Sequence, residues 1–124
     1  MRKREFFGAI TALVMMLFLC IGNGVRTSRI TDDLFAETKS CYEAAKQGRG
    51  SNTDRLAMLW SDNLGYFECT LPHAEVEAVA QTIMEFSGAM ETQDENEYTR
   101  AYHVLCEKLA HLKKVDSLSI RNIL

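Results

Sequence analysis

The stretch FFGAITALVMMLFLCIGNGV, residues 6–25, is an apolar run without a single charged side chain. As a helix rising about 1.5 Å per residue, it would extend roughly 30 Å, enough to cross the hydrocarbon core of a bilayer. Three basic residues, Arg2, Lys3 and Arg4, come directly before it. The pattern therefore predicts a single transmembrane anchor over residues 6–25, in contact with the lipid bilayer.

A cleaved signal peptide is the alternative to a retained anchor. The run is only slightly longer than the apolar part of a signal peptide, and Gly22 and Gly24 are small residues of the kind found near cleavage points. Basic residues favour the cytoplasmic side of a membrane. We therefore expect a single-pass protein of the cell membrane, with residues 1–5 as a basic cytoplasmic amino terminus and residues 26–124 as an extracytoplasmic helical domain.

The composition of the chain indicates one small helical domain after the anchor. The 124 residues are 47% hydrophobic and 25% charged, which suits one core and not two. A single proline and few β-branched residues after position 30 favour helices over strands. The net charge is −3, and the basic amino terminus makes the remainder more acidic still. This balance disfavours nucleic acid as a partner.

The first two helices of this domain follow from apolar spacing and from turn residues. One helix is predicted over Thr31–Gln47, as a continuation of the anchor, and Gly48 and Gly50 are expected to end it. Ser51 or Asn52 is expected to cap the next helix. The apolar stripes predicted for the two helices are Ile30, Leu34, Phe35, Cys41, Tyr42 and Ala45, and then Leu56, Leu59, Trp60, Leu64 and Phe67.

Two further helices complete the prediction. Pro72 is expected at the first position of the third helix, where its missing N–H costs nothing, and Thr92 with Glu95 matches a capping box for the fourth. Residues 117–124 are expected to form a short apolar tail docked on the domain. The predicted stripes are Val76, Val79, Ala80, Ile83, Phe86 and Met90, and then Tyr98, Ala101, Tyr102, Leu105, Leu109 and Leu112. Short connections favour antiparallel neighbours, so the expected fold is all-α, an anchor followed by a small antiparallel bundle of about four helices.

The sharpest candidate for chemistry is a possible metal site. His103, Cys106 and His111 repeat at helical spacing, so they could share one flank of the fourth helix as weak candidate metal ligands. A closed zinc site usually draws its ligands from two elements, and His73 is the one other histidine of the chain. Solvated residues of a helix face are the favoured interpretation. No catalytic residue, metal site or cofactor is therefore predicted.

The remaining residues of chemical interest have structural interpretations. Trp60 lies in an apolar stripe and is expected in the core, and His73 is expected to serve at a helix start. Cys41, Cys69 and Cys106 allow at most one internal disulfide, with three possible pairings. Nothing in their surroundings lowers a thiol pKa, so buried free cysteines are favoured over a redox centre.

Several features in a fixed order resemble a known group of proteins. They are Trp60, then Phe67 seven residues on, the Leu71-Pro72-His73 entry to the third helix with Val76 following, and the closing SLSIRNIL of residues 117–124. Together they resemble the bacterial domain-of-unknown-function family 4363, short chains with an amino-terminal anchor followed by a helical region. The resemblance covers nearly the whole chain and brings no activity. It implies a retained anchor and an envelope protein of Gram-positive bacteria.

The expected function is that of a non-enzymatic accessory or interaction domain at the bacterial cell envelope. No glycine-rich phosphate loop, nucleophile elbow or zinc-protease pair is present in the sequence. The partner is expected to be another membrane or envelope protein, bound through acidic residues such as Glu75 and Glu77, or Asp94 and Glu95. The alternatives are a metal-binding protein or enzyme that uses the two histidines and the cysteine named above, and a helical domain that senses a peptide or small ligand.

Overall fold

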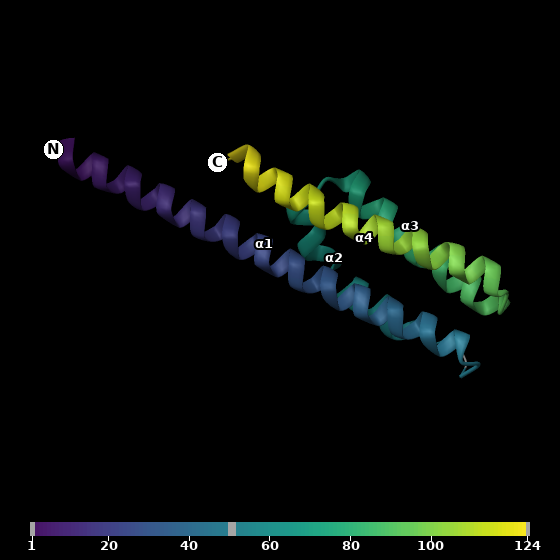
Figure 1. Cartoon of the computed structure of the whole chain (residues 1–124). Coiled ribbons are helices and arrows are strands. Elements are labelled where there is room, and N and C mark those ends of the chain that lie inside the picture. The colour runs from purple at the N-terminus through teal and green to yellow at the C-terminus, as the bar shows by residue number, and fades with distance from the viewer. Residues whose placement is uncertain (1, 50–51, 124) are drawn as a thin grey trace.

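The computed structural model describes residues 2–49 and 52–123, with side chains described as far as residue 116. In this part of the chain every regular element is a helix, which confirms the predicted all-α class. The elements are α1 (Arg2–Lys46), α2 (Asp54–Thr70), α3 (His73–Thr92) and α4 (Glu95–Ile123). The chain reverses its direction at each connection, so α4 returns along α1 (Figure 1).

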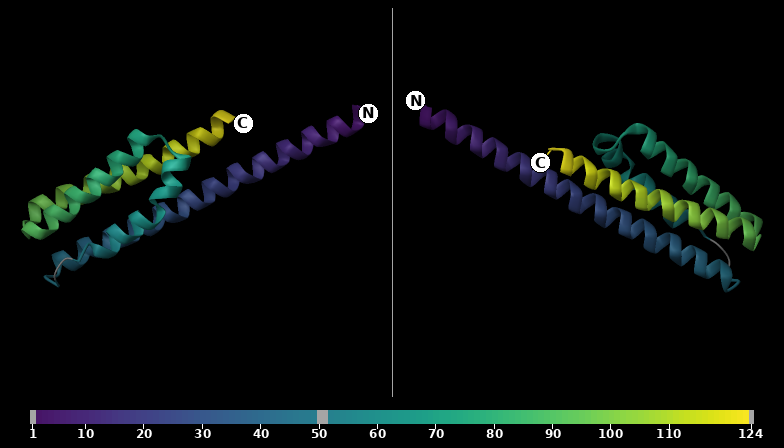
Figure 2. Two further views of the ribbon diagram at one scale, coloured as in Figure 1. Left: turned by 180° about the vertical axis from the view of Figure 1, so that it is seen from behind. Right: turned by 45° about the horizontal axis from the view of Figure 1, so that its top comes forward.

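The predicted anchor and the first predicted helix form one continuous helix, α1. Its first part extends beyond the other helices, as both views of Figure 2 show. Helix α1 ends before Gly48. The backbone φ of Gly48 is +70°, a left-handed value that glycine adopts at little energetic cost. The Gly48 N–H donates to the Ala45 carbonyl at 3.1 Å and the Arg49 N–H to the Ala44 carbonyl at 3.0 Å. This is a Schellman ending, and it confirms the glycine stop expected at Gly48.

The predicted apolar stripes form one shared core. The buried residues include Leu34 of α1, Leu56 of α2, Phe86 of α3 and Leu109 of α4, each with no exposed surface. A ring of partly buried residues packs against them, and these are Phe35, Tyr42, Ala45, Leu59, Leu64, Tyr66, Ala80, Ala89, Ala101 and Tyr102. Each predicted stripe therefore faces the core, with its smaller or edge members partly exposed.

The core side of α1 also contains buried threonines, which the apolar stripe did not include. Thr27, Thr31 and Thr38 have no exposed surface. The Thr31 hydroxyl donates to the Thr27 carbonyl and the Thr38 hydroxyl to the Leu34 carbonyl, each at 2.7 Å. A hydroxyl bonded one turn back within its own helix can be buried without an unsatisfied polar group.

One predicted helix start differs from the structure, and another is confirmed in part. Pro72 precedes α3 as its cap residue and does not occupy the first helical position, and its carbonyl accepts the Val76 N–H at 3.2 Å. In the second helix, Thr53 occupies the cap position without a side-chain hydrogen bond, while Asn52 Oδ1 accepts the Asp54 N–H at 3.0 Å. Asn52 therefore orders the turn before α2. Ser51, the other predicted cap, lies outside the described residues.

The capping box predicted at Thr92 is wrong. The Thr92 hydroxyl donates back to the Ala89 carbonyl at 2.6 Å, so Thr92 belongs to the end of α3. Asp94 caps α4 instead, with its Oδ1 accepting the Asn96 N–H at 3.0 Å. The reason is Gln93, whose φ of 58° ends α3 in the left-handed region, so that the cap residue of α4 is Asp94 and the helix begins at Glu95.

The predicted tail is also different in its backbone. α4 continues to Ile123, because no glycine or proline interrupts the chain after Pro72 and Gly88. The backbone of residues 117–123 is therefore helical. The predicted docking of this tail on the domain concerns side chains outside the described ones.

Candidate functional site

The three candidate metal ligands of α4 have different neighbours. His111 Nε2 lies 3.3 Å from Glu75 Oε2 of α3, whereas the exposed His103 has its ring 5.4 Å from that of Tyr102. Burial raises the pKa of the Cys106 thiol, which disfavours the thiolate that a metal needs. Among residues 2–49 and 52–123, no three His, Cys, Asp or Glu side chains are grouped so that they could hold a metal ion.

The positions of His73 and Trp60 agree with structural roles for both residues. His73 is exposed, and its Nε2 lies 2.9 Å from Glu77 Oε1, one turn further along α3. This pair joins the first two turns of the helix. Trp60 is 7% exposed and stacks on Phe67, with ring centroids 5.3 Å apart. The prediction that Trp60 belongs to the core is confirmed.

The four cysteines are all free thiols. Cys41 is buried, its thiol donates to the Asn52 carbonyl at 3.5 Å, and burial raises its pKa. Cys69 is exposed, so the expectation that the cysteines are buried is wrong at this position. Cys69 follows the buried Phe67 by two residues, which places it on a different side of α2. It is a natural labelling site on the folded domain.

An aromatic cluster joins the end of α1 to the start of α4. The Tyr42 ring stacks on Tyr102, with centroids 4.1 Å apart and an interplanar angle of 6°, and it meets the edge of Tyr98 at 5.9 Å. Its hydroxyl lies 3.3 Å from Thr99 Oγ1, and this hydrogen bond, with the Lys46 ammonium, lowers the Tyr42 pKa. The sequence places each of these tyrosines in a predicted apolar stripe. It does not indicate that tyrosines of two different helices contact one another.

A second polar contact ties α2 to α1 at the end of the predicted anchor. The Tyr66 hydroxyl donates to the Asn23 carbonyl at 2.8 Å and lies 3.2 Å from Thr27 Oγ1. The Arg26 guanidinium carbon lies 4.2 Å from the centroid of the Tyr66 ring. This contact marks the level on α1 at which burial begins, since Thr27 is its first buried residue.

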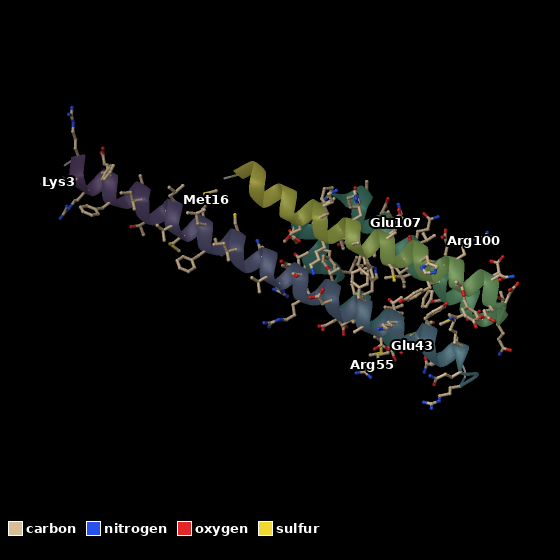
Figure 3. The ribbon with its side chains drawn as sticks, viewed as in Figure 1. Lys3, Met16, Glu43, Arg55, Arg100 and Glu107 are labelled. Atoms are coloured by element: carbon tan, nitrogen blue, oxygen red, sulfur yellow. The ribbon has the colours of Figure 1, made fainter. Side chains whose placement is uncertain are left out.

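A surface groove lies between α1 and α2. We call it the α1–α2 groove, and its volume is about 500 Å³. Its lining residues are Asp33, Ala36, Glu37, Arg55, Met58, Leu59 and Asp62. Three carboxylates and one guanidinium give the lining a net negative charge, and its apolar residues come from both helices. Figure 3 shows the Arg55 side chain beside α1.

Two features of the α1–α2 groove favour a partner. Met58 is 64% exposed, so the groove presents a large apolar side chain to a partner. The charged pair is loose, with Arg55 Nε 3.7 Å from Glu37 Oε2 and the Arg55 side chain 86% exposed. The Glu37 side chain is only 20% exposed, whereas the long contact and the exposed guanidinium leave Arg55 able to exchange partners.

Three of the acidic residues predicted as a docking surface already have partners. Glu75 already pairs with His111 and Glu77 with His73. Asp94 accepts the hydrogen bond that caps α4. The sequence could have indicated the groove through Met58, which lies off the apolar stripe of its helix, but the approach of α1 and α2 required the fold.

Comparison with known proteins adds no relative. A scan against family models, a search of curated proteins and a search of solved structures each give no match to this chain. Function is therefore inferred from the chain's own residues. Two features distinguish this chain from an ordinary small helical domain: the unburied apolar part of α1, and the acidic α1–α2 groove.

Proposed function

We propose that this chain is a membrane-anchored docking protein of the bacterial cell envelope, without catalytic activity. Residues 6–25 of α1 would cross the membrane, and the helices from residue 26 onward would bind another membrane or envelope protein. One observation carries this proposal. The apolar first part of α1 is exposed, although it belongs to the same helix that packs into the core further along.

The cost of that exposure in water supports a lipid environment. Phe7, Phe18 and Leu19 are 65%, 74% and 66% exposed, and none of the residues in the most apolar window of α1 is buried. Figure 3 labels Met16 on this part of α1, where the side chain is 58% exposed. A row of exposed apolar side chains of this length exceeds the patches of an ordinary soluble domain. By length and composition, α1 can cross a membrane.

Retention of the anchor is part of the proposal. The resemblance to the family of short anchored proteins supports it, and Tyr66 bonds to Asn23 within the segment that cleavage would remove or truncate. The mass of the intact protein purified from membranes tests it. We expect the mass of the full chain, and a mass that lacks residues before Gly22 or Gly24 would contradict retention.

The orientation is tested through Cys69. A membrane-impermeant maleimide added to intact cells should label this exposed thiol if the folded domain lies outside. The Cys69→Ser variant is the matched control, because the less accessible Cys41 and Cys106 remain in it. Labelling that appears only after the membrane is opened, without unfolding, would contradict the proposed orientation.

The proposed docking surface is the α1–α2 groove, and charge reversal tests it. Asp33→Lys with Asp62→Lys should release a partner that copurifies with the wild-type protein in mild detergent. Glu91→Lys with Glu107→Lys is the control, since it makes the same change of charge at exposed residues outside the groove. Equal loss of the partner in both double variants would contradict the groove, and purification of the wild type as a lone monomer would count against docking.

A further inference from the structure

We propose that the bundle rests on the same bilayer that α1 crosses, with the last turns of α4 lying in the headgroup region. This inference rests on the proposed membrane span. It names a second lipid contact, formed by the carboxyl-terminal end of the chain. Three elements carry it: the register of α4 along α1, the Tyr66 contact at the end of the span, and the residues of the α4 terminus.

The register of α4 against α1 is given by two contacts. Lys113 Nζ lies 3.0 Å from Asp32 Oδ1, and Thr99 Oγ1 lies 3.3 Å from the Tyr42 hydroxyl. The two helices run antiparallel, and Figure 1 shows the end of α4 beside α1. Both rise about 1.5 Å per residue. Moving ten residues from each partner of the first contact places Ile123 level with Gly22, and moving 24 residues from each partner of the second places it level with Phe18. The last turn of α4 is therefore level with the carboxyl-terminal part of the span, between Phe18 and Gly22.

α2 reaches the same level from another side. Its Tyr66 hydroxyl donates to the Asn23 carbonyl, and its ring lies against the Arg26 guanidinium. Tyrosine is enriched at membrane interfaces, where its ring contacts the acyl boundary and its hydroxyl the polar layer. Arginine can place its charged group among headgroups while its aliphatic stem contacts apolar surface. The Tyr66 contact thus has the composition of a membrane–water interface.

The residues at the end of α4 suit the same layer. Residues 117–124, SLSIRNIL, contain four aliphatic residues and one arginine, and no acidic residue after Asp116. An apolar helical segment with basic charge fits the headgroup region of an anionic bilayer. Ile21 and Val25 of α1 remain 57% and 56% exposed although α4 runs beside them. The end of α4 therefore leaves the span open to lipid.

Quenching of tryptophan fluorescence by brominated lipids tests this arrangement. Trp60 is the one tryptophan of the chain, so Trp60→Phe gives a background for single-tryptophan variants. Full-length protein is placed in phosphatidylcholine–phosphatidylglycerol vesicles brominated near the headgroup end of the acyl chains or near their middle. Ile123→Trp and Ile120→Trp report on the end of α4, and Met15→Trp reports on the span. His103→Trp is the matched control, about 30 Å back along α4 from Ile123.

The expected result is loss of fluorescence at positions 120 and 123, strongest with the shallow bromines, and at position 15 with the deep ones. His103→Trp should keep its fluorescence in both. If position 15 is not quenched, the span itself fails. If position 15 is quenched while positions 120 and 123 lose no more than position 103, the span stands and the α4 contact is overturned. Should Trp60→Phe lower the helix content, the same variants are measured with Trp60 retained and the wild-type signal subtracted.

Discussion

The two parts of α1 differ in burial, because all the buried residues of this helix lie in its second part. In residues 2–26 the large apolar side chains are exposed except for the partly buried Leu17, and Phe18 is the most exposed at 74%. In residues 27–46 the fully buried side chains include Thr27, Thr31 and Thr38, together with Leu34. The backbone is one unbroken helix through both parts. Exposure along α1 therefore runs opposite to what hydropathy alone would give.

The difference teaches that burial depends on the neighbours that the fold supplies. From residue 27 onward, α2 and α4 cover one side of α1, and each buried threonine has a hydrogen-bond partner. Before residue 27 no described side chain covers the helix to this extent, so its apolar residues require another apolar environment. A bilayer is the environment that their number and length match.

The largest expected effect separates the two parts directly. Leu34→Ala should lower the free energy of unfolding by about 2–5 kcal/mol, because it opens a cavity in the core. Leu13→Ala, at a 60% exposed position of the first part, should lower it by less than about 1 kcal/mol. Denaturation in detergent, followed by Trp60 fluorescence, measures both. Equal losses would mean that the first part of α1 also packs on the domain.

The next effect concerns one glycine within the first part of α1 and one glycine directly after the second part. Gly48→Ala should lower the free energy of unfolding by about 1–2 kcal/mol, because its φ of +70° strains any side chain with a Cβ. Gly22→Ala, in helical backbone with open space around a Cβ, should be neutral or stabilising by up to about 1 kcal/mol. The same denaturation assay applies. A destabilising Gly22→Ala would indicate close packing against Gly22 that the described side chains do not provide.

A smaller effect is expected at the boundary. Tyr66→Phe removes the hydroxyl bonded to Asn23 and should lower the free energy of unfolding by about 0.5–1.5 kcal/mol. Tyr66→Leu also removes the ring beside Arg26 and should cost more. Unfolding in detergent and in vesicles measures the two variants. Unchanged stability of Tyr66→Phe would show that α2 is not held to α1 at this level.

The smallest effect is expected from the ion pair that sets the register of α4. Lys113→Gln should lower the free energy of unfolding by less than about 1 kcal/mol, since both side chains are well exposed. The loss should shrink further in high salt. Lys114→Gln is the control, as the described side chains provide it with no ion pair. A large, salt-independent loss at Lys113 would point to a buried role for this residue.

Much of the fold could be predicted from the sequence, because apolar spacing is a local signal. The stripes that contain Leu34, Trp60, Phe86 and Leu109 all face the core as predicted. Helix ends were harder to predict. Gln93 adopts a left-handed backbone conformation, which a glutamine does not indicate in the sequence. That one residue moved the start of α4 from the predicted capping box at Thr92.

The candidate site was less accessible to sequence reasoning. The α1–α2 groove joins Asp33 and Asp62, which are far apart in the chain, and only the packing of the two helices brings them together. The same difficulty applies to His111. The sequence predicted it as a weak metal ligand on a helix flank, whereas in the structure it lies beside Glu75 of another helix. Pairings between distant elements depend on register, and helical periodicity contains no information on register.

The unbroken backbone of α1 has a mechanical consequence for the proposed docking. From Val25 to Lys46 the helix contains no interruption, so the proposed span and the folded domain would move as one rod. At about 1.5 Å per residue, Glu37 would stand roughly 18 Å above Val25. A partner in the same membrane would therefore have to present its binding surface at that height. The α1–α2 groove would select its partner by distance from the membrane as well as by charge.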